Sequence, residues 1–193
     1  MRHPFLHIIF VVFVVLLLLI TENTVMATPD QEIQFKDITV TTSKSHLLLF
    51  GIIKNDKTAE LKQALHSGIP MQFTFFIELF KTKDNWPDEK LKTMEFNHIL
   101  KYDPLKENYQ VEIGEQKYKK FTYKNLSDAL QAMSEVNGLK VIELSKLLPN
   151  NSYQLRMKAE LFKKTLPMNL HYLIPFISMW DLETDWFTIE FTY

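Results

Sequence analysis

The 193-residue sequence contains no cysteine, only four glycines and a formal net charge of -1. The lack of cysteine excludes disulfides, thiol nucleophiles, thiolate metal sites and a lipid-bearing cysteine. Four glycines leave little material for loops that hold phosphate, and the sequence has no P-loop, Rossmann or G-x-S-x-G pattern. Because Arg156 is the only arginine beyond Arg2 and the chain has no strong positive charge, we expect no nucleic-acid partner.

The N-terminus has the pattern of an export signal. Arg2 and His3 precede an unbroken apolar run, Ile8–Ile20, and a polar stretch follows that ends in Val25-Met26-Ala27. As a helix this run would span about 20 Å, which is short of a hydrocarbon core of about 30 Å. We expect residues 1–27 to be a signal peptide cleaved after Ala27; an uncleaved anchor is the alternative. Either way, residues 28–193 would form a single β-rich domain outside the cytoplasm.

The stretch Gly68–Phe80 predicts a central β-strand, because apolar side chains occupy every second position. Phe76 and Phe80 lie on its second face, so we expect that face to be partly covered. Similar patterns predict a strand at 33–40, with a bulge near Lys36-Asp37, and further strands at 94–102, 109–113, 117–124, 139–144, 153–161 and 187–193. The continuous apolar run His46–Lys54 is compatible with a strand buried on both faces.

Two short helices interrupt this pattern. The first begins at Asp56 or Thr58 and stops at Gly68, and the second begins at Asn125 or Ser127 and stops at Asn137-Gly138. Their apolar stripes are Leu61, Ala64, Leu65 in the first and Leu126, Ala129, Leu130, Met133, Val136 in the second. Since most connections are too short for a parallel crossover, the fold class is mainly β: an antiparallel β-sandwich or a partly open barrel of about eight or nine strands with two short helices.

The titratable residues do not form a recognisable catalytic or metal-binding motif. His46, His66, His98 and His171 lack metal-ligand spacing. His98 falls on an apolar face, where we expect a neutral, hydrogen-bonded core residue, and His66 falls in the last turn of a helix, where a cation suits the helix dipole.

Asp181, Glu183 and Asp185 would point the same way in an extended chain, as calcium ligands do. An EF-hand loop needs glycine where Trp186 stands and glutamate where Thr192 stands. We therefore expect a solvated acidic turn, with no catalytic residue, no metal and no cofactor.

The stretch Leu166–Trp180 is strongly apolar and is broken by Pro167 and Pro175. It is interpreted either as a crossover that packs on one end of the fold or as a surface for a partner or a membrane. The second interpretation makes its large apolar side chains the candidate docking site: Leu173, Ile174, Phe176, Ile177, Met179 and Trp180.

Several motifs occur in an order that resembles a known family. They are Ala64–Pro70, Trp86, Tyr102-Asp103, Leu126–Leu130, Tyr153–Leu161, Leu166-Pro167, and Trp180-Asp181-Leu182 before Asp185-Trp186-Phe187. This order is similar to that of the bacterial exported proteins grouped as domain-of-unknown-function family 4390, over roughly Ile33–Tyr193. The resemblance implies a bacterial envelope protein without established activity or catalytic residues. Because members are often encoded near a membrane sensor kinase, it also implies a role in envelope sensing.

Three classes of function are compared. The expected function is a non-enzymatic cell-envelope interaction or sensory accessory module, in the periplasm or at the outer face of the inner membrane, with an envelope protein such as a membrane sensor kinase as partner. The alternative is a binding protein for a small apolar ligand or lipid, which a cavity of several hundred cubic ångströms would favour. A hydrolase would need titratable groups that converge in one cleft, and the sequence offers no such pair.

Overall fold

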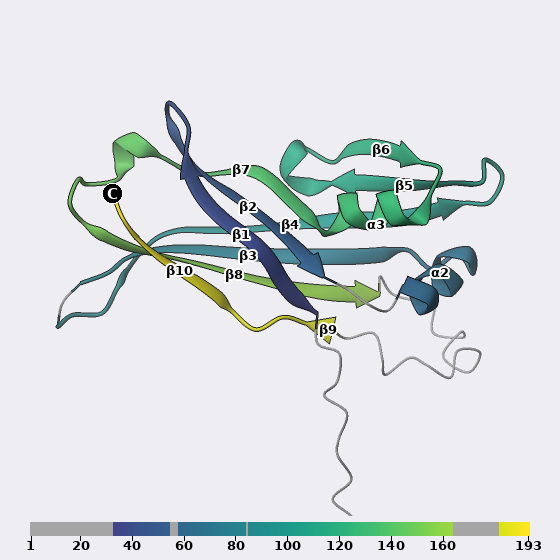
Figure 1. Ribbon diagram of the computed structural model, residues 1–193, viewed down its shortest axis with the longest axis horizontal. Helices are drawn as coiled ribbons and strands as arrows, with labels where there is room; N and C mark the ends of the chain where they lie inside the picture. Colours follow the sequence, from purple (N-terminus) through teal and green to yellow (C-terminus); the bar gives the residue numbers. More distant parts are fainter. Residues whose placement is uncertain (1–32, 55–57, 84, 164–181) are drawn as a thin grey trace, which may run out of the picture. The chain divides into compact units, whose positions relative to one another are not determined.

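The computed structural model describes residues 33–54, 58–83, 85–163 and 182–193 (Figure 1). The predicted signal peptide, residues 1–27, lies outside the described residues. Gln31–Tyr193 forms one compact unit. Within the described part of the chain, no helix has the length and apolar character needed to cross a membrane.

The larger of two sheets is built around β3 (Met71–Lys81), the strand that the sequence predicts to be central. Over its whole length β3 pairs with β4 (Glu89–Asp103) on one side and β8 (Ser152–Lys163) on the other. The remaining strands extend the sheet outward: β5 (Asn108–Ile113) and β6 (Lys119–Tyr123) beyond β4, and β10 (Phe187–Thr192) and the short β9 (Leu182–Glu183) beside β8.

The smaller sheet has the order β1 (Gln34–Thr42), β2 (His46–Lys54), β7 (Glu135–Glu143). Its strands cross over the larger sheet in Figure 1. All pairings between the described strands are antiparallel. The protein is therefore mainly β and sandwich-like rather than a closed barrel, and β9 is the one described strand that the sequence pattern did not predict. The predicted bulge is confirmed, since the register of β1 shifts between Lys36 and Thr39 and Asp37 has a φ of 54°.

The core lies between the two sheets, because each strand turns alternate side chains inward. On β3 the inward set is the one that the sequence predicts, and Phe75 is completely buried. The expected partial cover of the opposite face is also confirmed, since Phe76 and Phe80 are half-buried there. The apolar residues that join the two sheets into one cluster include Leu47, Leu49, Ile53, Phe73, Phe75, Ile77, Leu100, Val141, Leu155 and Met157.

The first helix, α2 (Thr58–His66), has the predicted form. Leu61, Ala64 and Leu65 are buried, and Gly68 follows with a φ of 82°. The amide of Ile69 donates to the carbonyl of Ala64, which satisfies one of the free carbonyls at the helix end.

The second helix, α3 (Leu126–Ser134), ends earlier than predicted. The chain enters β7 at Glu135, and Val136 pairs with Gly51 of β2 as a strand residue. The prediction that Asn137-Gly138 ends the helix is therefore wrong. Gly138 instead supplies a φ of 71° inside β7, where the register against β2 shifts between Leu49 and Gly51. Val136 fits the apolar stripe of a helix and also the inward face of a strand, and its pairing with β2 places it in the strand.

Removal of a ring from the inner face of β3 tests this assignment of faces. We expect Phe75→Ala to lower the free energy of unfolding by about 3–5 kcal/mol, since it empties a filled core site. Phe76→Ala deletes the same ring from the half-buried outer face, so its loss should be clearly smaller. Urea denaturation of both variants measures the difference. Equal losses would contradict the assignment.

Candidate functional site

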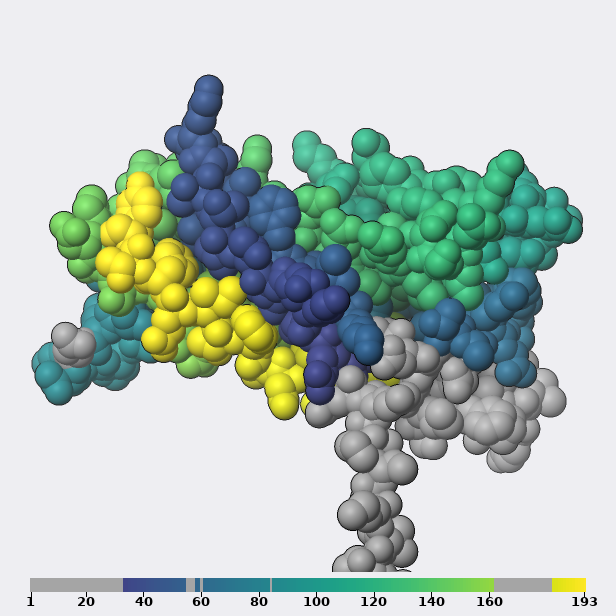
Figure 2. Space-filling model, in the orientation of Figure 1, coloured from purple at the N-terminus to yellow at the C-terminus, as the bar shows by residue number. Residues whose placement is uncertain are grey.

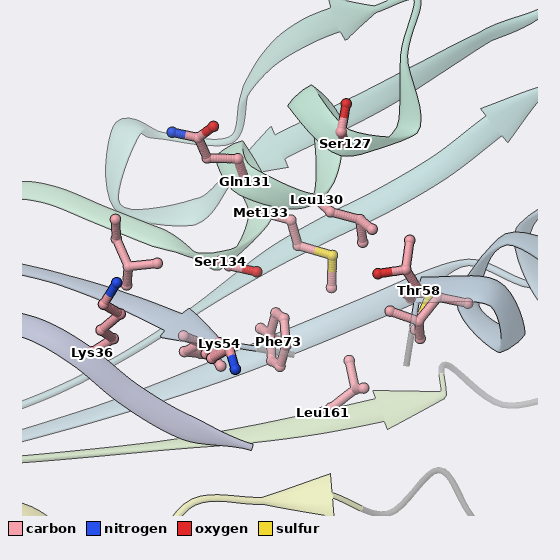
Figure 3. Close-up of a pocket in the computed structure, with 14 residues that line it drawn as sticks. Lys36, Lys54, Thr58, Phe73, Ser127, Leu130, Gln131, Met133, Ser134 and Leu161 are labelled. Atoms are coloured by element: carbon pink, nitrogen blue, oxygen red, sulfur yellow. The ribbon is translucent and has the colours of Figure 1, made fainter. Parts of the chain in front are cut away.

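A cavity of about 340 Å³ lies between the two helices and the sheets (Figure 3). Its lining includes the last three residues of β2. The cavity therefore lies where the smaller sheet ends and where α2 and α3, instead of that sheet, pack on the larger sheet. Most of the wall is apolar, and its principal contributors are Leu61, Met71, Phe73, Leu130, Met133 and Leu161. The cavity is thus a mostly apolar site whose described lining comes from six elements: β1, β2, α2, β3, α3 and β8.

A few polar groups are set into this wall. The hydroxyl oxygens of Thr58 and Ser134 point into the cavity in Figure 3. Lys36 and Lys54 lie on the β1–β2 side, opposite Thr58. Lys36 forms an exposed ion pair with Asp37 at 3.6 Å. An apolar wall with a small number of polar groups is the usual composition of a small-molecule site.

His98 links three elements behind the cavity wall. Its side chain is completely buried, and the predicted need for a hydrogen-bond partner is met twice. Nδ1 lies 2.9 Å from the carbonyl oxygen of Met133, at the end of α3, and Nε2 lies 2.6 Å from Oε2 of Glu115. Both ring nitrogens face oxygen acceptors, so the two contacts require two protons, either both on the ring or one on the ring and one on Glu115.

This arrangement holds α3 in place. The carbonyl of Met133 is one of the last four of the helix, which have no partner within it, and His98 donates to it. Glu115 reaches His98 from a short turn, η1 (Gly114–Gln116). A Cβ on Gly114 would stand 2.5 Å from the carbonyl oxygen of Asn97, so glycine permits this close approach. Because the side chain of Met133 lines the cavity, the buried pair also fixes part of its wall.

His66 lies in the last turn of α2, as predicted, but its contacts extend beyond the helix end. Its ring stacks on Tyr102 at 4.1 Å, and its Nε2 forms a hydrogen bond of 2.8 Å with the hydroxyl of Tyr109. Burial raises the pKa of Tyr109, and the nearby Tyr102 raises it further. The cluster attaches α2 to β4 and β5 of the larger sheet.

The charged groups on the strands form pairs rather than a catalytic cluster. Glu112 accepts hydrogen bonds from Lys101 and Lys120, and these contacts lower its pKa despite partial burial. Lys158 lies between Glu160 and Glu183, and its hydrogen bond to Glu183 is the main reason that its pKa is raised.

The expectation of a solvated acidic turn falls partly on described residues. Glu183 pairs with Lys158 at 2.7 Å and Asp185 is exposed, whereas Asp181 lies outside the described residues. No cluster of three histidine, aspartate or glutamate side chains suited to a metal ion occurs among the residues that the structure describes.

A second hollow, of about 280 Å³, lies between the start of β1 and the segment before β10. Ile33 and Phe35 line one side, and Trp186 and Phe187 line the other. The two aromatic side chains are 45% and 42% exposed, respectively. In Figure 2 the residues of β10, in yellow, lie alongside those of β1, in dark purple. This side of the sandwich, where two edge strands meet, therefore presents aromatic surface to solvent.

The docking residues predicted from the sequence all lie outside the described residues: Leu173, Ile174, Phe176, Ile177, Met179 and Trp180. Sequence reasoning missed the cavity, because its lining residues were assigned to helix stripes and strand faces. It also missed Glu115 as the partner of His98. The one available signal was the position of His98 on an apolar face, which required a partner without identifying it.

Removal of the buried imidazole tests its structural role. We expect His98→Ala to lower the free energy of unfolding by about 3–5 kcal/mol, because Glu115 and the Met133 carbonyl lose a buried partner. His46→Ala is the matched control; it removes an imidazole whose one hydrogen bond among the described residues is to the neighbouring Ser45, and it should change stability by at most about 0.5 kcal/mol. Thermal and urea denaturation give both values. A His98→Ala loss as small as that of the control would contradict this role.

Comparison with known proteins identifies a family but no individual relative. The family described as Domain of unknown function (DUF4390) matches residues 30–190, which is most of the chain. Neither the curated proteins nor the solved structures include a significant match. The match agrees with the order of motifs in the sequence, and on this evidence the chain belongs to domain-of-unknown-function family 4390.

Proposed function

We propose that the protein is a non-enzymatic binding module of the bacterial cell envelope and that its apolar cavity holds a small apolar ligand. The observation that carries the proposal is the cavity itself. Its volume of about 340 Å³ falls in the range of about 300–1,000 Å³ that ligand pockets occupy, and its wall is mostly apolar. A site of this composition binds by removing apolar surface from water, at about 0.8 kcal/mol per buried methylene.

The chemistry of the lining supports binding rather than catalysis. General acid–base or nucleophilic catalysis needs titratable groups that converge on the reacting atoms. Among the described residues, those that line the cavity include two lysines but no histidine or carboxylate. The closest approach to a catalytic pair among the described residues, His98 and Glu115, is closed to solvent.

The proposed location follows from the N-terminal sequence. The apolar run Ile8–Ile20, the polar stretch after it and the residues before Ala27 favour export to the periplasm or to the outer face of the inner membrane. A domain without cysteine needs no oxidative folding step there. The mass of the exported protein would show whether cleavage occurs after Ala27.

Filling the cavity tests the proposed binding site. We expect the purified protein to bind the neutral fluorescent probe N-phenyl-1-naphthylamine. Leu130→Trp should weaken this binding at least about tenfold, or about 1.4 kcal/mol, because the larger ring occupies the space of the probe. Fluorescence titration measures the dissociation constant, and circular dichroism confirms that the variant is folded.

The matched control is Leu148→Trp, which adds the same ring at a side chain that is 55% exposed and does not line the cavity. It should bind the probe as the unaltered protein does. If the unaltered protein binds no probe, or if a folded Leu130→Trp variant binds it with unchanged affinity, the cavity is not the binding site.

A second candidate function is docking to an envelope protein such as a membrane sensor kinase. The observation that favours it is the exposed pair Trp186 and Phe187 at the open side of the sandwich. Thr184 holds this segment in place, since its amide and hydroxyl exchange hydrogen bonds with the backbone of Ala159 at 2.9 and 3.0 Å. Rigid, partly exposed aromatic side chains are enriched at protein interfaces.

Site-specific crosslinking tests this second function. We expect a photoreactive phenylalanine analogue at position 186 to capture a membrane sensor kinase in the native envelope. The same analogue in place of Tyr118, another exposed aromatic residue, should not capture it. Mass spectrometry identifies the product. Failure to capture a kinase, or equal capture from both positions, would reject this docking surface.

A further inference from the structure

One edge of the larger sheet lacks the features that usually prevent strands of different molecules from pairing. The two sheets end in β1 and β7 and in β6 and β10. β1 is interrupted by its bulge and β7 by Gly138, and β6 carries the exposed Lys119 and Lys120. Bulges and edge lysines oppose edge-to-edge pairing. β10 pairs with β8 in unbroken register and contains no lysine, proline or glycine, so it is the described edge best suited to accept another strand.

The hydrogen bonds at the end of the chain indicate which backbone groups of β10 face away from β8. The amide of Tyr193 donates to the carbonyl of Asn151, the residue opposite it on the path of β8. Hydrogen-bonded positions alternate along an antiparallel pair, so the odd-numbered residues of β10 bond to β8. The even-numbered residues, which include Thr188 and Glu190, direct their amide and carbonyl groups outward. Figure 1 shows β10 at the margin of the larger sheet, and no second described strand pairs with it.

The side chains on the inner face of β10 continue the core to this edge. Phe187, Ile189 and Phe191 lie opposite the buried Met157, Leu155 and Tyr153 of β8. The ring of Phe191 stacks on that of Tyr153, with 5.6 Å between the ring centroids. Phe187 is exposed, and the other two are only partly buried. A further strand at this edge would therefore cover apolar surface as well as pair the free backbone groups.

A second copy of the chain supplies a strand that matches this edge. Two β10 edges related by a two-fold axis pair antiparallel, and outward-facing residues must meet outward-facing residues. In one such register Glu190 would lie opposite Glu190 of the second copy, and like charges directly opposite are unfavourable. The register two residues along places Thr188 opposite Glu190, Phe187 opposite Phe191, and Ile189 opposite itself. Further shifts shorten the paired segment, so charge and length select this register.

The charge beside the edge favours the same register. Arg156 lies opposite Thr188 on β8, on the outer face of the sheet. Glu190 of the second copy would then lie on the same face two strands from Arg156, at a strand separation of roughly 10 Å. Exposed opposite charges still attract over about this distance, and the small side chain of Thr188 stands between them.

We propose that the protein forms a two-fold symmetric dimer by antiparallel pairing of its β10 edges, which joins the two larger sheets into one continuous sheet. Ile189 lies at the axis, and on either side of it Thr188 and Glu190 of opposite copies exchange backbone hydrogen bonds. Trp186 precedes the paired segment. This inference goes beyond the proposed ligand site, and neither the dimer nor its test involves a ligand.

Single cysteine substitutions test the register, because the chain has no cysteine of its own. Opposite residues at a non-hydrogen-bonded position have Cα atoms about 4.5 Å apart, a separation that a disulfide spans. We expect Ile189→Cys to form a disulfide-linked dimer when the purified exported protein is mildly oxidised. Glu190→Cys, which is more exposed but lies opposite Thr188, should not link. Non-reducing electrophoresis shows the product. Equal linkage of both variants, linkage of Glu190→Cys alone, or linkage of neither would overturn the assignment.

Charge substitutions at position 188 test the surface without a covalent link. We expect sedimentation velocity at increasing protein concentrations to show a monomer–dimer equilibrium. Thr188→Lys, placed opposite Glu190, should tighten the dimer about tenfold, and Thr188→Glu should weaken it by a similar factor, because each pair occurs twice by symmetry. Thr122→Glu makes the same change on the exposed edge strand β6; it is the matched control and should leave the dissociation constant unchanged.

A proline variant separates loss of the dimer from loss of the fold. Thr188→Pro removes an outward amide and no hydrogen bond to β8, so we expect a folded protein that stays monomeric. Circular dichroism confirms the fold of each variant. An unaltered protein that is monomeric at every concentration would overturn the inference. A dimer that persists in Thr188→Pro, or one that ignores the charge at position 188, would use a different surface and would overturn it equally.

Discussion

The fold depends on the two-sided pairing of β3. From Met71 to Lys81 every residue of this strand has a partner on β4 and another on β8, so its backbone is satisfied by neighbours on both sides. That pairing fixes which side chains face inward. The inner row of β3 then needs an apolar cover, and three different elements supply it: the smaller sheet, α3 and α2.

The inward side chains of β3 are covered by the smaller sheet at one end and by helices at the other, and the cavity lies where the one gives way to the other. Strands of the smaller sheet pack closely over the middle of β3, where Phe75 and Ile77 are completely buried. Beyond the end of β2 the cover is two short helices of nine residues each, and the side chains of the described residues leave the cavity between them. His98 stabilises this end by joining β4 to the last turn of α3 and to Glu115. The proposed ligand site and the buried pair are thus consequences of the same transition from sheet to helix.

The sequence predicts those elements whose local pattern agrees with their tertiary setting. β3 and β8 alternate cleanly because one face of each packs on the core, and the stop of α2 was predictable from Gly68. The end of α3 was not, since Val136 satisfies a helical stripe as well as a strand face and only its pairing with Gly51 settles the choice. The cavity depends on the spacing between layers, and Glu115 meets His98 only after β4 and β5 have formed, so neither could be predicted from periodicity.

The central claim is that the space beyond the end of β2 is a binding site. The most direct measurement is an NMR titration of the isotopically labelled domain with the neutral probe N-phenyl-1-naphthylamine, which follows the backbone amide of each residue. The account predicts saturable shifts concentrated at Ile52–Lys54 and Leu130–Ser134, two segments that line the cavity. Shifts confined to Trp186 and the start of β1, or no saturable shifts at all, would contradict it.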